Sequence, residues 1–252
     1  MERMEAFFSG HGFDPHRHDT YAIGYTMQGV QAFRYRGAAR ASAAGQAFVL
    51  HPDELHDGHA GTGAGFRYRI LYVAPALVHA ALGERGALPF WRDVIATNGA
   101  LMRAIVAALD DLESPLDELA RDQIVLALAD ALAVADRSLA RRTTAARHVR
   151  ASARARDLLD ASVTTSVTSA ELEAVTGLTR FAAACHFRAC YGTSPHRYLT
   201  MRRLDRARAL IRDDATLAEV AVASGFADQS HLTRQFRKAY GLAPGRYARM
   251  VA

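Results

Sequence analysis

The C-terminal part of the chain contains an internal repeat, which limits the possible folds more than any other feature of the sequence. Segment 177–198, GLTRFAAACHFRACYGTSPHRY, recurs as segment 225–247, GFADQSHLTRQFRKAYGLAPGRY. Phe187 returns as Phe236, 49 residues later, and the neighbouring Phe-Arg, Tyr-Gly, proline and tyrosine positions stay in register. Such agreement indicates two copies of one structural unit.

Each copy has the pattern of a short helix, a turn with glycine and a longer helix, which is the plan of a helix-turn-helix unit. In the second copy, Gly225 permits a left-handed turn, and Asp228 can cap a helix that begins at Gln229. At about 100° per residue, the apolar residues of that helix fall on one side. The opposite side carries donors and cations, namely Ser230, His231, Arg234, Arg237 and Lys238, flanked by Gln229 and Thr233. A solvated surface helix is the alternative, but the turn before it favours a helix that reads a DNA major groove.

The positive charge of the chain is concentrated in the C-terminal half. The formal net charge is +5, and Lys238 is the only lysine among the 31 basic residues. Arginines crowd the sequence after residue 136, whereas the first hundred residues are nearly balanced; examples are Arg141, Arg142, Arg202, Arg203, Arg206, Arg208 and Arg234. This asymmetry predicts a C-terminal half that faces a polyanion.

The N-terminal part of the chain has the pattern of a β structure. Between residues 7 and 74, short alternating runs are separated by glycine and proline, and the runs 21–27, 32–35, 46–50 and 66–73 are predicted strands. Regularly spaced short strands are typical of a barrel or a sandwich.

From residue 76 to 140 the apolar residues follow a helical period instead. One stripe consists of Leu101, Ile105, Leu109 and Leu112, and a second of Leu116, Leu119, Ile124, Leu128 and Leu132. These stripes are either the core of a helical hairpin or a dimer interface, and the sequence leaves both interpretations open.

The two cysteines and the overall hydropathy pattern indicate a cytoplasmic protein. Cys185 and Cys190 lack the spacing of a redox pair or a zinc site, so we expect reduced thiols. The sequence shows no signal peptide, and no apolar run approaches the ~20 residues of a membrane span.

The second copy of the repeat resembles the AraC/XylS family of bacterial transcription regulators. The resemblance rests on the pattern GFxDxSHLxRxFRxxYGxxP, which begins at Gly225, and on the preceding segments 194–199 and 203–210. It implies two helix-turn-helix units joined by a long helix at about 196–212, with the two reading helices in successive major grooves. By this resemblance, the principal base contacts of the second unit are Gln229, Ser230, Thr233 and Arg234, with His231 and Lys238 on the same face. The implied partners are double-stranded operator DNA, a small-molecule effector, RNA polymerase and, as one option, a second copy of the chain.

The first unit departs from the family pattern. Its corresponding contact positions are Arg180, Phe181, Ala184 and Cys185. Two positions that are apolar in the second unit also differ: Ala183 replaces Leu232, and Glu173 replaces Ala221. We therefore predict a looser unit and a poorer reader. Arg180 can still contact a phosphate or a base, and Phe181 can make an apolar contact, for example with a thymine methyl group.

Histidines in the N-terminal part resemble the two motifs of cupin barrels, which AraC-like regulators often carry as sensors. The matching positions are His16, His18 and Gly29, then Gly45, Pro52 and His56. Metal-dependent cupins add a carboxylate a few residues after the second histidine, but Tyr21, Ala22 and Ile23 occupy those positions here. We therefore expect no metal and no cofactor, and instead predict a ligand site formed by His16, His18, His56, Tyr25 and Tyr68.

The sequence thus predicts an α+β chain with three parts: a cupin-like sensor barrel at 1–75, a helical linker or dimerisation region at 76–146, and a double helix-turn-helix domain at 147–252. The predicted function is a transcription regulator that is not an enzyme and is controlled by a small ligand. Two alternatives are a metal-dependent cupin enzyme with a DNA-binding tail, and an accessory subunit that binds DNA only beside a partner.

Overall fold

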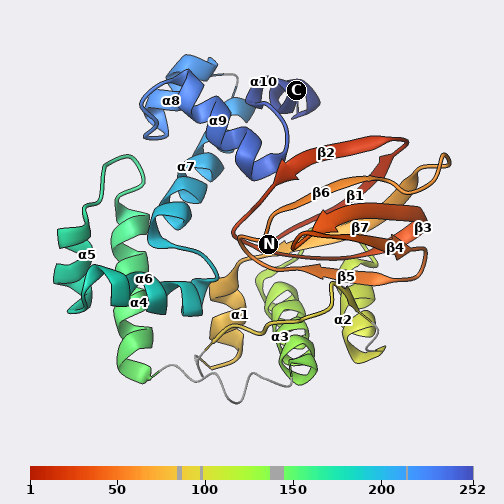
Figure 1. Ribbon diagram of the computed structural model, residues 1–252, viewed down its shortest axis with the longest axis horizontal. Helices are drawn as coiled ribbons and strands as arrows, with labels where there is room; N and C mark the ends of the chain where they lie inside the picture. The colour runs from red at the N-terminus through yellow and green to blue at the C-terminus, as the bar shows by residue number, and fades with distance from the viewer. Residues whose placement is uncertain (84–86, 97–98, 137–144, 214, 252) are drawn as a thin grey trace.

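The computed structural model describes residues 1–83, 87–96, 99–136, 145–213 and 215–251. It is an α+β structure in which an N-terminal antiparallel β domain is followed by helices, as the sequence predicts (Figure 1). Arg141, Arg142 and the adjoining part of the predicted linker lie outside the described residues.

The β domain consists of one eight-stranded sheet folded into two layers. Its strands are β1 (Glu2–Phe8), β2 (His11–His16), β3 (Tyr21–Tyr35), β4 (Ala38–Ala43), β5 (Ala47–Leu50), β6 (His56–Ala60), β7 (Phe66–Val73) and β8 (Ile95–Ala96). The long strand β3 belongs to both layers, since its first half pairs with β5 and its second half with β4 and β6.

The predicted strands at 46–50 and 66–73 are confirmed as β5 and β7. The two predicted strands at 21–27 and 32–35 are one continuous strand, because a bulge between Thr26 and Gln28 and the positive φ of Gly29 bend the chain without ending its pairing. Strands β1, β2, β4, β6 and β8 were not predicted individually. β2 and β6 are rich in histidine, aspartate and glycine, so they lack an apolar alternation.

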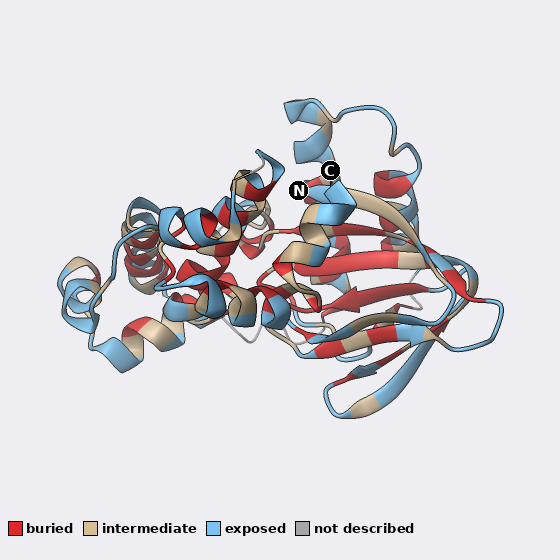
Figure 2. Ribbon diagram, turned by 90° about the horizontal axis from the view of Figure 1, so that it is seen from above, coloured by how far each residue is buried: buried red, intermediate tan, exposed pale blue. Residues whose placement is uncertain are grey.

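Helices α1 (Pro75–Ala81), α2 (Gly99–Leu109) and α3 (Glu118–Ala135) pack on the outer face of the sheet (Figures 1 and 2). Leu101, Ile105 and Leu128 form a shared core with Tyr21 and Ile23 of β3. The predicted apolar stripes are therefore mainly core beneath the sheet. The second stripe is wrong at Leu119, whose residue is 70% exposed.

The C-terminal region is all helical and contains two helix-turn-helix units. Its helices are α4 (Ala146–Ala161), α5 (Ser169–Thr176), α6 (Arg180–Tyr191), α7 (Pro195–Arg212), α8 (Leu217–Ala223), α9 (Gln229–Tyr240) and α10 (Pro244–Val251). The long helix α7 joins the α5–α6 unit to the α8–α9 unit (Figure 1). Both short helices begin with a capping box, Thr168 with Glu171 and Thr216 with Glu219, so the repeat extends to the caps. Among the described residues, no helix has the length and apolar character needed to cross a bilayer.

Candidate functional site

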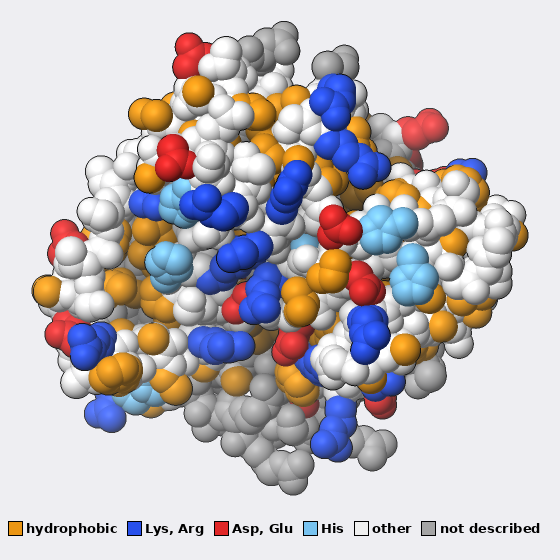
Figure 3. All heavy atoms as spheres, turned by 45° about the horizontal axis from the view of Figure 1, so that its top comes forward, with side chains coloured by type: hydrophobic (Ala, Val, Ile, Leu, Met, Phe, Trp, Pro, Cys, Tyr) orange, Lys and Arg blue, Asp and Glu red, His pale blue; other side chains and the backbone are white. Residues whose placement is uncertain are grey.

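Helix α9 separates an apolar face from a polar face as the sequence predicts. Leu232, Phe236 and Ala239 are buried against the rest of the second unit, whereas Gln229 and Arg234 are exposed. The remaining predicted contacts are Ser230 and Lys238, which are exposed, and His231 and Thr233, which are half-buried. Figure 3, in which the top of Figure 1 comes forward, shows lysine and arginine side chains in a band across this part of the surface.

The turn before α9 fixes where its first residues lie. Gly225 has a φ of 81°, the left-handed conformation expected from the sequence. Asp228 accepts a hydrogen bond from the backbone N–H of His231 at 2.6 Å and so caps the helix. The ring of His231 lies edge-on against Phe226, with 5.3 Å between centroids. His231 therefore stabilises the turn, and Gln229 and Arg234 project more freely.

Helix α6 has the same frame but a different surface. Ala183 and Phe187 are buried, as Leu232 and Phe236 are in α9. Phe181 is 74% exposed, and the guanidinium group of Arg180 lies 4.9 Å from the centroid of its ring. The carboxylate of Glu173 accepts a hydrogen bond from the Arg180 backbone N–H at 2.7 Å. The acid that departs from the family pattern thus helps to cap α6.

The C-terminal ends of α6 and α9 lie against the N-terminal domain. The carbonyl oxygen of Lys238 in α9 accepts a hydrogen bond from the backbone N–H of Arg17 at 2.9 Å. The glycines that end the two helices, Gly192 and Gly241, have φ values of 73° and 67°. A Cβ at Gly192 would lie 2.8 Å from the Pro52 side chain, and one at Gly241 would lie 2.8 Å from the Asp14 carbonyl oxygen. The N-terminal domain therefore holds both helices at their C-terminal ends, opposite Gln229 and Ser230 of α9 and Arg180 of α6. Among the predicted DNA contacts, Lys238 lies at the held end of α9.

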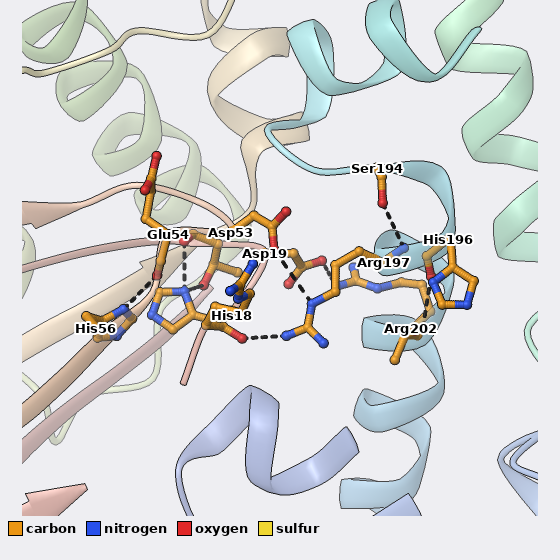
Figure 4. A network of polar contacts seen from close by, with 12 residues as sticks. His18, Asp19, Asp53, Glu54, His56, Ser194, His196, Arg197 and Arg202 are labelled. Atoms are coloured by element: carbon orange, nitrogen blue, oxygen red, sulfur yellow. Dashed lines mark hydrogen bonds and ion pairs between the residues drawn. The ribbon is translucent and has the colours of Figure 1, made fainter. Parts of the chain in front are cut away.

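Arginines of α7 form the rest of this interface. Arg202 donates to Asp19 at 2.7 Å, and Arg197 donates to the carbonyl oxygen of Arg17 at 2.5 Å and lies 3.8 Å from the Asp53 carboxylate (Figure 4). Burial raises the pKa of Asp19 to about 6, against the opposing effect of Arg202.

Three predicted ligand residues come together at the edge of the barrel that faces α7 and α9. His16, His18 and His56 are buried, and the imidazole centroids lie 4.3 Å apart for His16 and His56 and 4.9 Å apart for His18 and His56. Burial lowers the pKa of His18 to about 3 and also lowers the pKa values of His16 and His56, so the cluster consists of neutral imidazoles.

The two predicted tyrosines lie on opposite faces of the sheet. Tyr68 is buried in the barrel interior with Phe33, Phe48 and Phe66. Tyr25 packs on the other face of the sheet, in the core that contains α2 and α3. The prediction that both line one ligand site is therefore wrong at Tyr25, because Tyr68 of β7 pairs with the next residue, Thr26, and successive side chains of a strand lie on opposite faces.

Comparison with known proteins identifies the family. Residues 1–129, just over half of the chain, match the family model described as AraC-like ligand binding domain, and residues 172–250 match a helix-turn-helix domain. The chain belongs to the AraC family.

Several curated transcription regulators are similar to part of this chain. The probable transcriptional regulator LumQ of Photobacterium leiognathi is 37% identical over 82 residues, which is 32% of this chain and 33% of the relative. This match, like a 35% identical match to a putative AraC-like regulator of Streptomyces lividans, thus spans a third or less of the relative's length. The uncharacterized regulator YbfI of Bacillus subtilis is 22% identical over 227 residues, covering 87% of this chain and 81% of the relative.

The fold of the whole chain is similar to that of ToxT from Vibrio cholerae. One ToxT structure aligns with a TM-score of 0.68 and 11% identity over 99% of this chain and 98% of the other. Another, bound to (E)-4-(8-methylnaphthalen-1-yl)but-3-enoic acid, aligns with a TM-score of 0.68 and 10% identity over 100% of this chain and 99% of the other. At this identity the likeness concerns the fold alone.

Part of the arginine enrichment of this AraC-family chain has a structural role that the sequence did not reveal. Arg202 and Arg208 pair with Asp19 and Glu2 of the N-terminal domain. Arg203 and Arg206 donate to backbone carbonyl oxygens of their own domain. The prediction that this whole cluster faces a polyanion is therefore wrong for Arg202 and Arg208, whose charges are paired within the chain.

One buried polar residue of the barrel was also missed. Gln31 is 3% exposed and lies on the same side of β3 as Phe33 and Tyr35, which face the barrel interior. Its Oε1 atom accepts no hydrogen bond from any residue that the structure describes. The signal was present in the sequence, since a glutamine at an inward position of an alternating strand needs a partner.

Proposed function

We propose that this protein is a transcription regulator whose second helix-turn-helix unit reads operator DNA. The observation that supports the proposal is the exposed polar face of α9. Gln229, Ser230 and Arg234 are exposed on this face, whereas the opposite face of the helix is buried. Glutamine suits adenine and arginine suits guanine in the major groove. Among the described residues, Arg234 has no ion-pair partner, in contrast to Arg202.

The first unit contributes mainly position on the DNA backbone. Its helix α6 offers Arg180 at the exposed end, followed by Phe181, Ala184 and Cys185, which have few donors for base edges. An arginine at a helix N-terminus is suited to a phosphate contact, which fixes orientation but carries no sequence information.

The regulatory input enters through the N-terminal barrel. The proposed division of labour is a sensor formed by the β domain together with helices α1–α3, which share its core, and a reader at 147–252. The part predicted as a linker at 76–146 therefore belongs largely to the sensor. The proposed effector has an apolar body, which packs among the aromatic residues around Tyr68. It also has a hydrogen-bond donor, which pairs with the Oε1 atom of Gln31. The protein acts by binding and not by catalysis.

A second copy of the chain and RNA polymerase are the proposed protein partners. Leu119, Leu126 and Val134 are exposed on α3, and their spacing places them on one side of that helix. This stripe fits a homodimer contact, since an exposed apolar stripe is covered in most soluble proteins.

The test is selection of duplexes from a randomised pool by the full chain, followed by titration of the selected sequence. We expect one preferred sequence, affinity that falls steeply with salt, and loss of the preference in Arg234→Ala. Arg206→Ala is the matched control, because Arg206 is exposed in the same domain but donates to the Ala223 carbonyl oxygen. Selection of no sequence, or equal loss of preference in both variants, would contradict the proposal.

A further inference from the structure

The three histidines at the barrel edge have the composition and spacing of a metal site. His16, His18 and His56 each offer a ring nitrogen, and these nitrogens all lie within 4.8 Å of one another. In a tetrahedral zinc site, imidazole nitrogens at the usual metal distance are about 3.3 Å apart. Modest rotations of the three rings would therefore bring them onto one ion.

The hydrogen bonds of the rings select the nitrogen that would bind. In all three residues Nδ1 donates to a backbone carbonyl oxygen, that of Asp14 for His16, Thr20 for His18 and Glu54 for His56, at 2.9 to 3.0 Å. These bonds fix the tautomer and leave Nε2 with a lone pair, which is the usual arrangement around a metal-bound histidine. The Nε2 atom of His18 is buried and has no hydrogen-bond partner among the described residues.

The sequence predicts no metal here because the carboxylate of metal-dependent cupins is missing, but the geometry of the three histidines favours the opposite conclusion. We propose that His16, His18 and His56 bind one divalent transition-metal ion of the zinc class through Nε2, and that this ion holds the barrel edge against the second helix-turn-helix unit. Three imidazoles suit zinc, and three protein ligands leave the fourth position open to water or to a donor atom of the effector. The carboxylates of Asp14 and Asp57 attract positive charge at His16, and Arg197 opposes them.

The position of the site connects it to the reader. Residues 16–19 alternate between two roles. His16 and His18 are the proposed metal ligands, and Arg17 and Asp19 contact the C-terminal region. A Cβ at Gly241, at the end of α9, would lie 3.2 Å from Nδ1 of His16. An ion that fixes His16 and His18 to His56 on β6 would therefore also order the segment on which α9 rests. Only this consequence depends on the proposed function, since metal binding can be measured without DNA.

The first experiment measures metal binding by the full chain. After removal of metal by a chelator, Zn²⁺ is titrated in competition with a chromophoric chelator, and Co²⁺ is titrated by absorbance. We expect one equivalent of each ion and the intense visible bands of four-coordinate Co²⁺. His56→Ala should weaken binding by more than about 100-fold, because even loss of an outer partner of a ligand costs 10–100-fold. The control is a variant with His11→Ala and His59→Ala, which removes exposed histidines from the same two strands.

The second experiment measures amide hydrogen exchange at Arg17, whose N–H donates to Lys238. If exchange requires release of the ion, free Zn²⁺ at 100 times its dissociation constant should slow it about 100-fold. The site is refuted by less than one equivalent, by octahedral Co²⁺ bands, or by equal weakening in the control variant. The coupling is refuted by bound Zn²⁺ that leaves the exchange rate unchanged. The Co²⁺ spectrum of the unsubstituted protein tests four-coordination even if His56→Ala does not fold, and His16→Ala then tests the ligand set.

Discussion

The two helix-turn-helix units of this AraC-family protein share one framework and differ on the face that they present to solvent. Both reading helices bury a phenylalanine, Phe187 or Phe236, and both end at a glycine in the left-handed conformation. At matched exposed positions, however, the second unit has Arg234 and the first has Cys185. The comparison indicates that the residues that make the fold and the residues proposed to read DNA vary independently within one chain.

The units also differ in the depth of their packing. Leu232 is fully buried in the second unit, and the matched residue of the first unit is Ala183. A smaller side chain at this position removes apolar contact area between the reading helix and its neighbours. We therefore expect the second unit to be the more rigid of the two.

The largest expected effect concerns this packing difference. Leu232→Ala, which gives the second unit the residue of the first, should lower the free energy of unfolding by about 2–5 kcal/mol, because it leaves a cavity in a closed core. Denaturant titration measures the change. Val222→Ala is the control, since that residue is 70% exposed on the neighbouring helix α8. Equal effects of the two substitutions would mean that the second unit gains nothing from its leucine.

The next effect concerns the glycine that ends α9. Gly241→Ala and Gly177→Ala impose the same backbone strain, because the φ values are 67° and 68°. Only the first places a Cβ 2.8 Å from the Asp14 carbonyl oxygen, whereas nothing lies within 4 Å of a Cβ at Gly177. Gly241→Ala should therefore be less stable than Gly177→Ala by about 1–3 kcal/mol, as for other overpacked sites. Equal melting temperatures would show that α9 does not rest on the barrel edge.

Substitutions of the reading faces should have a smaller but more selective effect. Arg234→Ala should reduce discrimination at one base pair by about 1–3 kcal/mol, because it removes a bidentate contact to guanine. Cys185→Ala should leave affinity within about twofold, since a thiol is a weak donor. Fluorescence anisotropy titrations with matched and mismatched duplexes measure both. A larger loss from Cys185→Ala would reverse the assignment of the two units.

The smallest effect is expected at the helix caps. Asp228→Ala removes a 2.6 Å hydrogen bond at the start of α9 and should cost about 1 kcal/mol. Thr179→Ala removes the corresponding bond in α6, which is 3.4 Å long, and should cost less. Thermal unfolding of both variants ranks them, and a larger cost for Thr179→Ala would contradict the view that the second unit is the better ordered.

The sequence predicted the second unit well because its determinants are local. The glycine turn at Gly225, the cap at Asp228 and the apolar period of α9 all lie within a short window. The contacts between the two parts of the chain could not be predicted in the same way. Arg202 and Asp19 are 183 residues apart, so no local pattern distinguishes a paired arginine from one that is free to bind DNA.

In the barrel, too, local features were predicted from the sequence and long-range contacts were not. Alternation along β3 located its first half, but the bend at Gly29 carries the strand from one layer to the other and decides which side chains meet. Tyr25 was placed wrongly beside Tyr68 for a different reason, since the residue that pairs with Tyr68 is Thr26 and the two tyrosines face opposite sides of the sheet. The histidines were found as a set, but their separation and hydrogen bonds depend on how β2 pairs with β6.

The most direct test of the account is a titration of the unsubstituted protein against operators that are scrambled in one half-site at a time. If α9 supplies most of the sequence discrimination, scrambling the half under the second unit should cost several kcal/mol, at about 1–3 kcal/mol for each base pair read. Scrambling the half under the first unit should cost less than the change at one such base pair. Equal costs for the two halves would contradict the account and would assign base reading to Arg180 or Phe181.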